Sequence, residues 1–145
     1  MDTVGELGEA ALIQRIRDRV PPAPAWVPVS IGDDAAVVEP QRGTLDVFTT
    51  DTLVEGVHFD FAFVPPADVG HKTLAVNLSD LAAMGATPRW ALLSLSLPLA
   101  NAEWVLSFAA GFKSLAEVHN VSLVGGDTTS GPLSVSLTAL GTIEP

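Results

Sequence analysis

The sequence is organised around VFTTDTLVEGVHF, residues 47–59. An apolar run from Leu45 to Phe48 gives way abruptly to hydroxyls and a carboxylate, a pattern typical of a strand that delivers polar groups where it ends. Further apolar segments end at an aspartate in the same manner: Val29–Asp34, Ala75–Asp80 and Leu123–Asp127. We therefore predict a scaffold that brings several carboxylates to one site around residues 49–51.

The composition excludes several classes of protein. With 145 residues, of which 48% are hydrophobic, the chain has the size of one domain and can bury a core. The net charge is −10 and the seven basic residues form no cluster, which argues against a nucleic-acid partner. The absence of cysteine excludes disulfides, thiolate metal sites and a cysteine nucleophile. Because residues 1–20 lack an apolar signal core and no apolar run approaches membrane-spanning length, we expect a soluble, cytoplasmic protein with no membrane partner.

Periodicity and turn residues predict elements in the order α, β, β, β, α, β, α, β, β. Helices are predicted over 6–20, over 67–84 and from an N-cap at Asn101 to a left-handed Asn120, and strands over 26–31, 35–39, 44–50, 90–97, 121–124 and 133–143. We expect the strands over 35–39 and 44–50 to form a hairpin. The order favours an α/β or α+β fold with a mixed, largely antiparallel sheet covered by helices. Because the chain stops directly after a strand, we expect it to be one domain of a longer protein.

The predicted helix over 67–84 carries an apolar and a polar stripe, at about 100° per residue. The apolar stripe, predicted to face the core, consists of Leu74, Leu78 and Leu81. The polar stripe holds Thr73, Asn77 and Asp80 within roughly 60° of one another. Asp80 is therefore expected to share its face with a hydroxyl and an amide rather than with the leucines.

The candidate site residues are aspartates at the ends of these segments: Asp33, Asp34, Asp51, Asp80 and Asp127. Any one of them is ordinarily a solvated turn residue, and for Asp33 this interpretation stays open because its neighbour Asp34 is the alternative. As a group they lack nearby Lys or Arg, and convergent carboxylates are unfavourable unless a cation lies among them. Oxygen ligands with hydroxyl helpers, Thr49 and Thr50, suit Mg²⁺, whose remaining ligand is then a phosphate.

Gly125–Thr129, with the sequence GGDTT, is interpreted as a glycine turn between strands. It is either a plain turn or a backbone that approaches a phosphate, with Asp127 on the metal. A P-loop and a GxGxxG motif are both absent, which excludes those nucleotide sites. Of the three histidines, His71 and His119 are expected to be structural, and His58 beside the Asp51 segment is either structural or a ligand contact. No Ser-His-Asp or Cys-His arrangement is present, so we assign no catalytic nucleophile or general base.

Several motifs stand out together: Gly32–Ala35, Thr49–Phe59, Ala75–Ala86 and Gly125–Thr129. They resemble the thiamine-monophosphate kinase family, whose relatives are aminoimidazole ribonucleotide synthetase, selenophosphate synthetase and the hydrogenase-maturation dehydratase. The run NLSDLAAMGA points to this superfamily, and TDTLVEGVHF points to the kinases within it. The resemblance covers residues 5–143. It implies the aminoimidazole ribonucleotide synthetase N-terminal-domain fold, with residues 1–145 forming a single ATP- and Mg²⁺-binding domain and the family's C-terminal domain absent from this chain.

The resemblance also implies roles for the site residues. The residues that would hold Mg²⁺ ions bridging the phosphates of ATP are Asp34, Thr49, Thr50, Asp51, Asp80 and Asp127. Gly126 and Asp127 would contact ATP, and His58 would contact thiamine monophosphate. The implied activity is the ATP-dependent phosphorylation of thiamine monophosphate to thiamine diphosphate. The alternatives are another ATP-using member of the superfamily and a non-catalytic nucleotide-binding or dimerisation module.

A homodimer that pairs through its sheet is a further implication of the resemblance. The residues offer a separate argument for it. The strands over 90–97 and 133–143 alternate with Ser and Thr rather than carrying Lys or Pro, so they lack the usual protection of a free edge. We therefore expect these two strands to be exposed sheet edges that a second copy covers.

Overall fold

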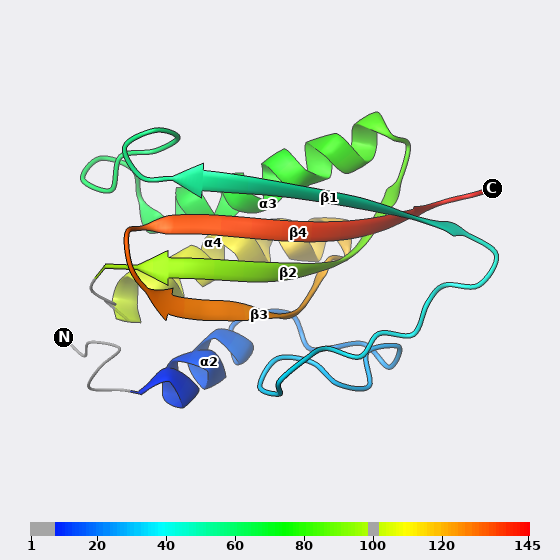
Figure 1. Ribbon diagram of the computed structural model, residues 1–145, viewed down its shortest axis with the longest axis horizontal. Coiled ribbons are helices and arrows are strands. Elements are labelled where there is room, and N and C mark those ends of the chain that lie inside the picture. The colour runs from blue at the N-terminus through cyan, green and yellow to red at the C-terminus, as the bar shows by residue number, and fades with distance from the viewer. Residues whose placement is uncertain (1–7, 99–101) are drawn as a thin grey trace.

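The computed structural model describes residues 8–98 and 102–145 and shows one sheet with helices packed on it (Figure 1). The elements in chain order are α2 (Glu9–Arg17), β1 (Leu45–Val54), α3 (Pro66–Ala83), β2 (Thr87–Leu97), α4 (Ala102–His119), β3 (Ser122–Ser130) and β4 (Ser134–Ile143). The predicted helix over 67–84 is confirmed as α3. The second long helix is confirmed as α4, and its predicted N-cap Asn101 lies outside the described residues, as do residues 6 and 7.

The four strands are ordered β1-β4-β2-β3. β4 pairs antiparallel with β1 and with β2, whereas β3 pairs parallel with β2. The parallel pair is joined through α4, because strands that run in the same direction need a long crossover connection. The predicted mixed, largely antiparallel sheet covered by helices is confirmed.

The core lies between the sheet and the two helices α3 and α4, which cover one of its faces (Figure 1). Leu74, Leu78 and Leu81 are all buried there, which confirms the predicted apolar stripe. Alternate residues of the central strand β4, Val135, Leu137 and Ala139, meet them from the sheet. The two helices can approach closely because Gly70 of α3 has no side chain. A Cβ at this position would overlap the carbonyl oxygen of Phe108 on α4.

The predicted hairpin over 35–50 does not form. Within residues 26–39 the only strand-like pairing is an isolated bridge between Val29 and Val37, and β1 pairs with β4 instead. Pro40 follows directly after the predicted strand over 35–39 and cannot donate to a ladder, and Val37 is bridged to Val29 instead of to β1, so this segment stays a loop. β1 also extends to Val54, so Thr49, Thr50 and Asp51 lie inside the strand rather than at its exit.

The predicted glycine turn at Gly125-Gly126 is also wrong, because both residues lie inside β3, which runs on to Ser130. The glycines serve a close approach between strands instead: a Cβ at Gly126 would overlap the carbonyl oxygen of Leu93 on β2, and φ at Gly126 is 149°. The prediction that the strands over 90–97 and 133–143 are edges fails as well. They are β2 and β4, the two central strands, and the edges are β1 and β3.

Candidate functional site

The alternation of β1 divides the predicted polar run between two faces of the sheet. Thr49 points toward α3, where its Oγ1 lies 3.4 Å from Oδ2 of Asp80 and donates to it. Thr50 points to the opposite face, where its hydroxyl accepts a hydrogen bond from Thr138, its register partner on β4, at 3.2 Å. Of the predicted ligands in this run, Thr49 and Asp51 therefore share a face with Asp80, and Thr50 does not.

Asp51 and Asp80 form a pair of neighbouring carboxylates. Burial raises the pKa of the Asp51 carboxyl above its ordinary value, and the hydrogen bond and the negative charge of Asp80 raise that pKa further, while nearby His58 lowers it. Asp51 is half-buried on β1 and Asp80 is exposed on α3. A pair of this kind is stabilised either by a shared proton or by a cation, and its oxygen atoms are the ligands that hard cations prefer.

His58 lies near enough to the Asp51 carboxyl to lower its pKa, and it belongs to the turn that follows β1. Gly56 adopts φ of 80°, a conformation that glycine tolerates, and the chain turns back so that the N–H of Val54 donates to Nδ1 of His58 at 2.9 Å. Nζ of Lys72 on α3 donates to the main-chain oxygen of His58 at 2.8 Å. Because Nδ1 accepts a hydrogen bond, the neutral ring carries its proton on Nε2, which can donate to a ligand.

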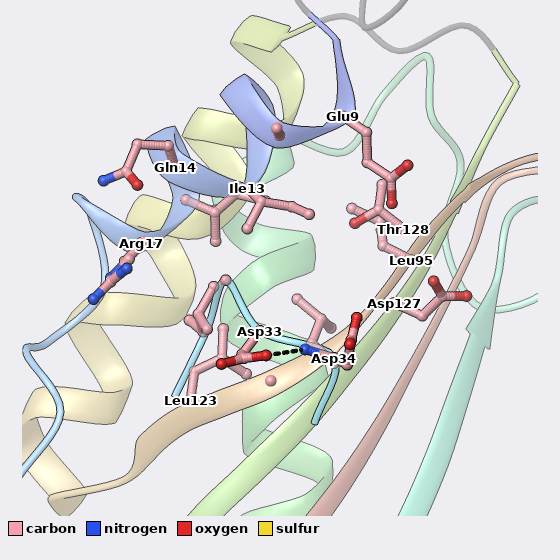
Figure 2. Close-up of a pocket in the computed structure, with 17 residues that line it drawn as sticks. Glu9, Ile13, Gln14, Arg17, Asp33, Asp34, Leu95, Leu123, Asp127 and Thr128 are labelled. Carbon is pink, nitrogen blue, oxygen red and sulfur yellow. Dashed lines mark hydrogen bonds between the residues drawn. The ribbon is translucent and has the colours of Figure 1, made fainter. Parts of the chain in front are cut away.

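A second acidic group lies near β3. Asp34 and Asp127 both line a cavity of about 600 Å³, together with Gly126, Thr128 and residues of α2 (Figure 2). Asp33 lines it too, but its Oδ1 accepts the N–H of Asp34 at 2.8 Å and so shapes the loop. This contact gives Asp33 a local structural role through Oδ1. Its second carboxylate oxygen and the Asp34 carboxylate remain available to a ligand.

The two acidic groups lie at opposite edges of the sheet. In the register of the strands, Asp127 aligns with Ser94, Ser136 and Thr52, the residue after Asp51. Three strand spacings of about 4.8 Å each separate these backbone positions by about 14 Å. Accordingly, no group of three or more His, Cys, Asp or Glu side chains within residues 8–98 and 102–145 is spaced to hold a metal ion. The structure brings Thr49, Asp51 and Asp80 together, and separately Asp34 and Asp127.

Some residues that line the cavity are not predicted from the sequence, and they belong to α2. α2 contributes Glu9, Ile13 and Arg17 to it, and Figure 2 shows Glu9 beside Thr128 and Arg17 at the other end of the helix. A Cβ at Gly32, whose φ is 107°, would lie 3.4 Å from Nη1 of Arg17. From the sequence, Arg17 is only one of the charges between the apolar positions of a helix, because nothing local indicates that α2 lies beside this loop.

These features define a domain in which helices cover a mixed sheet and acidic side chains lie at both edges of that sheet. Comparison with known proteins identifies the family to which a chain of this class belongs. The chain belongs to the AIR synthase related protein family, whose N-terminal domain matches residues 32–143. Thiamine-monophosphate kinase of Escherichia coli K12 is 48% identical over 131 residues, which are 90% of this chain and 40% of that protein. The corresponding kinase of Haemophilus influenzae is 42% identical over 138 residues, or 95% of this chain and 42% of the relative.

Solved structures that resemble this chain include proteins of the same name as these relatives. The crystal structure of thiamine-monophosphate kinase from Stenotrophomonas maltophilia K279a has a TM-score of 0.83 at 51% identity, covering 94% of this chain and 43% of that one. AaThiL complexed with AMPPCP and TMP has a TM-score of 0.68 at 36% identity, covering 99% and 45%. The chain spans less than half the length of these relatives. Within the described part of the chain, no helix is long and apolar enough to cross a membrane.

Proposed function

We propose that this chain supplies the Mg²⁺- and ATP-binding part of a thiamine-monophosphate kinase, which phosphorylates thiamine monophosphate to thiamine diphosphate. The observation that carries the proposal is the Asp51–Asp80 pair, held beside Thr49 and His58. Support comes from the relatives named as this kinase and from the structure of AaThiL, which was complexed with AMPPCP and TMP.

The chemistry of the donor set fits Mg²⁺. Carboxylate and hydroxyl oxygens are the ligands of hard divalent cations, and a cation would stabilise the ionised Asp51, whose pKa is raised by burial and then by its hydrogen bond with Asp80 and the charge of Asp80. In the proposed site Asp51, Asp80 and Thr49 would hold ions at one edge and Asp34 and Asp127 would hold ions at the other, whereas Thr50, on the opposite face of β1, would have to leave Thr138 to contribute. When bound, Mg²⁺ neutralises phosphate charge and so lowers the repulsion between the two substrates.

No residue of the chain needs to act as a general base. A phosphate monoester has its second pKa near 6, so at neutral pH the acceptor is already mostly a dianion. One of its oxygens forms a bond to the γ-phosphorus of ATP while the bond from that phosphorus to the ADP oxygen breaks, in line. The chain therefore has to orient the substrates and offset like charge. In the proposed site the backbone at Gly126 contacts ATP, and Nε2–H of His58 donates to the acceptor phosphate.

A homodimer through the sheet is part of the proposal. β1 is an edge strand with no second strand partner among the described residues, and Phe48 on the face away from α3 is 65% exposed. A second copy that paired with β1 would complete the hydrogen bonding of this edge and cover the Phe48 ring. Light scattering at micromolar concentration should give the mass of two chains, and the mass of one chain would contradict this part of the proposal.

The test of the proposed function is a binding titration with both substrates. The 145-residue chain should bind thiamine monophosphate more tightly when Mg²⁺ and a non-hydrolysable ATP analogue are present, and other phosphate monoesters should bind more weakly. Equal binding of unrelated monoesters would favour another ATP-using member of the superfamily. We expect turnover by this chain to be very low, because its relatives are more than twice as long. Rapid formation of thiamine diphosphate would contradict that expectation.

A further inference from the structure

The loop that carries Asp33 and Asp34 is attached to the sheet at its base. Its two arms pair through hydrogen bonds between Val29 and Val37, and the N–H of Glu39 donates to the main-chain oxygen of Trp26 at 2.8 Å. Residues 30–36 form the tip beyond these pairs. The tip is what lines the cavity together with Asp127, so the position of the base decides where Asp34 lies.

Arg89 of β2 contacts both arms at this base. Its Nη2 donates to the main-chain oxygen of Glu39 at 2.5 Å, and its guanidinium carbon lies 4.1 Å from the centroid of the Trp26 ring. A planar, permanently charged guanidinium suits both contacts, because it donates a directed hydrogen bond and stacks on an indole face at the same time. A lysine ammonium would keep the charge and lose the flat stacking surface.

The backbone of β2 is shaped to present this side chain. The register between β2 and β4 shifts between Pro88, which aligns with Gly141, and Trp90, which aligns with Leu140, so Arg89 has no register partner on β4. A bulge of this kind re-aims a side chain and is frequent beside functional sites. The close approach at this point depends on Gly141, since a Cβ at that position would come within 2.7 Å of the carbonyl oxygen of Thr87.

We propose that Arg89 is a positioning residue that docks the Asp34 loop on the sheet and thereby keeps Asp34 beside Asp127. The inference rests on the proposed function, because it assigns Arg89 a role in binding Mg²⁺·ATP. Arg89 does not touch the ligand; it raises the fraction of molecules whose loop is docked. The apparent dissociation constant is the intrinsic one divided by that fraction, so each tenfold loss of docked loop weakens binding tenfold.

The test compares Arg89→Gln with Arg42→Gln, which removes the same charge from an exposed position in the turn between this loop and β1. Hydrogen exchange of the Val37 and Glu39 amides reports whether the two arms that Arg89 contacts stay paired at the base of the loop, and calorimetry with Mg²⁺ and a non-hydrolysable ATP analogue reports binding. In Arg89→Gln we expect the docked fraction to fall to about one tenth, so that the affinity falls about tenfold and both amides lose nearly all of their protection from exchange. Exchange at Leu137 in β4 should stay unchanged, and Arg42→Gln should match the wild type in every reading.

Conservative changes separate positioning from a general loss of stability. Arg89→Lys should recover part of the affinity, and Trp26→Phe should keep more of it than Trp26→Leu, because phenylalanine retains a flat face. Trp26→Leu also serves as the second variant if Arg89→Gln fails to fold, since it leaves β2 intact. Wild-type exchange at Val37 and Glu39 in Arg89→Gln would overturn the proposal, and so would a nearly complete loss of protection at these amides with unchanged affinity.

A failure of the proposed function and a failure of the role of Arg89 give different results in these experiments. A wild-type chain that binds no Mg²⁺·ATP would contradict the proposed function itself. The exchange comparison between Arg89→Gln and Arg42→Gln would then still confirm or contradict the docking of the loop by Arg89.

Discussion

Thr49 of β1 donates a hydrogen bond to Asp80 of α3 across a distance of 3.4 Å, although the two residues are 31 positions apart in the sequence. This contact ties the edge of the sheet to the helix at the place where Asp51 lies beside Asp80. Because a hydroxyl that donates to one carboxylate leaves the other oxygens available, the pair remains open to a cation.

The first prediction concerns the pH dependence of stability. The folded-state pKa of Asp51 lies above its unfolded value, so the carboxyl contributes stability that is fully present below the unfolded pKa and is lost as the pH rises through the folded pKa. Asp51→Asn lacks this loss. In low salt without Mg²⁺, the variant should be more stable than the wild type at pH 7, and its advantage should shrink as the pH falls toward the unfolded pKa. Urea unfolding at several pH values measures the difference, and an advantage that grows in acid would show that burial and the charge of Asp80 do not raise this pKa.

The second prediction separates ligand binding from folding. Asp80→Asn should weaken the binding of Mg²⁺·ATP by about tenfold or more, since a hydrogen bond or contact to a charged group is worth about 1.5–3 kcal/mol. The fold should be retained because Asp80 is exposed. The matched control is Asp46→Asn, which removes an exposed carboxylate from the start of β1. Equal losses in the two variants would mean that net charge alone governs binding.

The third prediction assigns His58 to the acceptor. His58→Gln should weaken the binding of thiamine monophosphate by about tenfold while changing Mg²⁺·ATP binding little, because one hydrogen bond to a charged phosphate is lost or weakened. His71→Gln, a change at an exposed histidine of α3, is the control. Calorimetry with each ligand in turn measures both affinities. A loss confined to ATP would place His58 on the other substrate.

The fourth prediction tests the packing of α3 on α4. Gly70→Ala should destabilise the chain by about 3 kcal/mol, because a Cβ at this position overlaps the Phe108 carbonyl and the two helices have to separate. Ser79→Ala, at an exposed position of the same helix, should change stability by less than about 0.5 kcal/mol. Urea unfolding of both variants measures the difference, and a neutral Gly70→Ala would show that the helices are less closely packed.

Local sequence patterns are sufficient to predict those helices and strands whose burial follows a regular spacing of apolar residues. The leucine stripe of α3 and the long alternating strand β4 both follow from spacing that one element alone imposes. The left-handed conformation predicted for Asn120 is confirmed by its φ of 54°. The pairing of strands depends instead on residues far apart in the chain, so the predicted hairpin over 35–50 and the assignment of β2 and β4 as edges are wrong.

The site is predictable in its residue types and less so in its arrangement. Aspartates at segment ends point to a cation, but the sequence does not show that strand alternation turns Thr50 away from Thr49, or that sheet order puts Asp127 at the other edge from Asp51. Sequence patterns do not predict the role of Arg89 at all. It depends on a bulge and on a loop some fifty residues earlier in the chain, and neither leaves a local signal.

In the proposed function the acidic side chains of this domain bind ATP through Mg²⁺. The most direct test is a calorimetric titration of the wild-type chain with a non-hydrolysable ATP analogue, once with Mg²⁺ and once with EDTA. We predict binding with Mg²⁺ and binding at least about tenfold weaker in EDTA, because the carboxylates of a chain with net charge −10 repel the triphosphate. Equal affinity in the two titrations would contradict the claim.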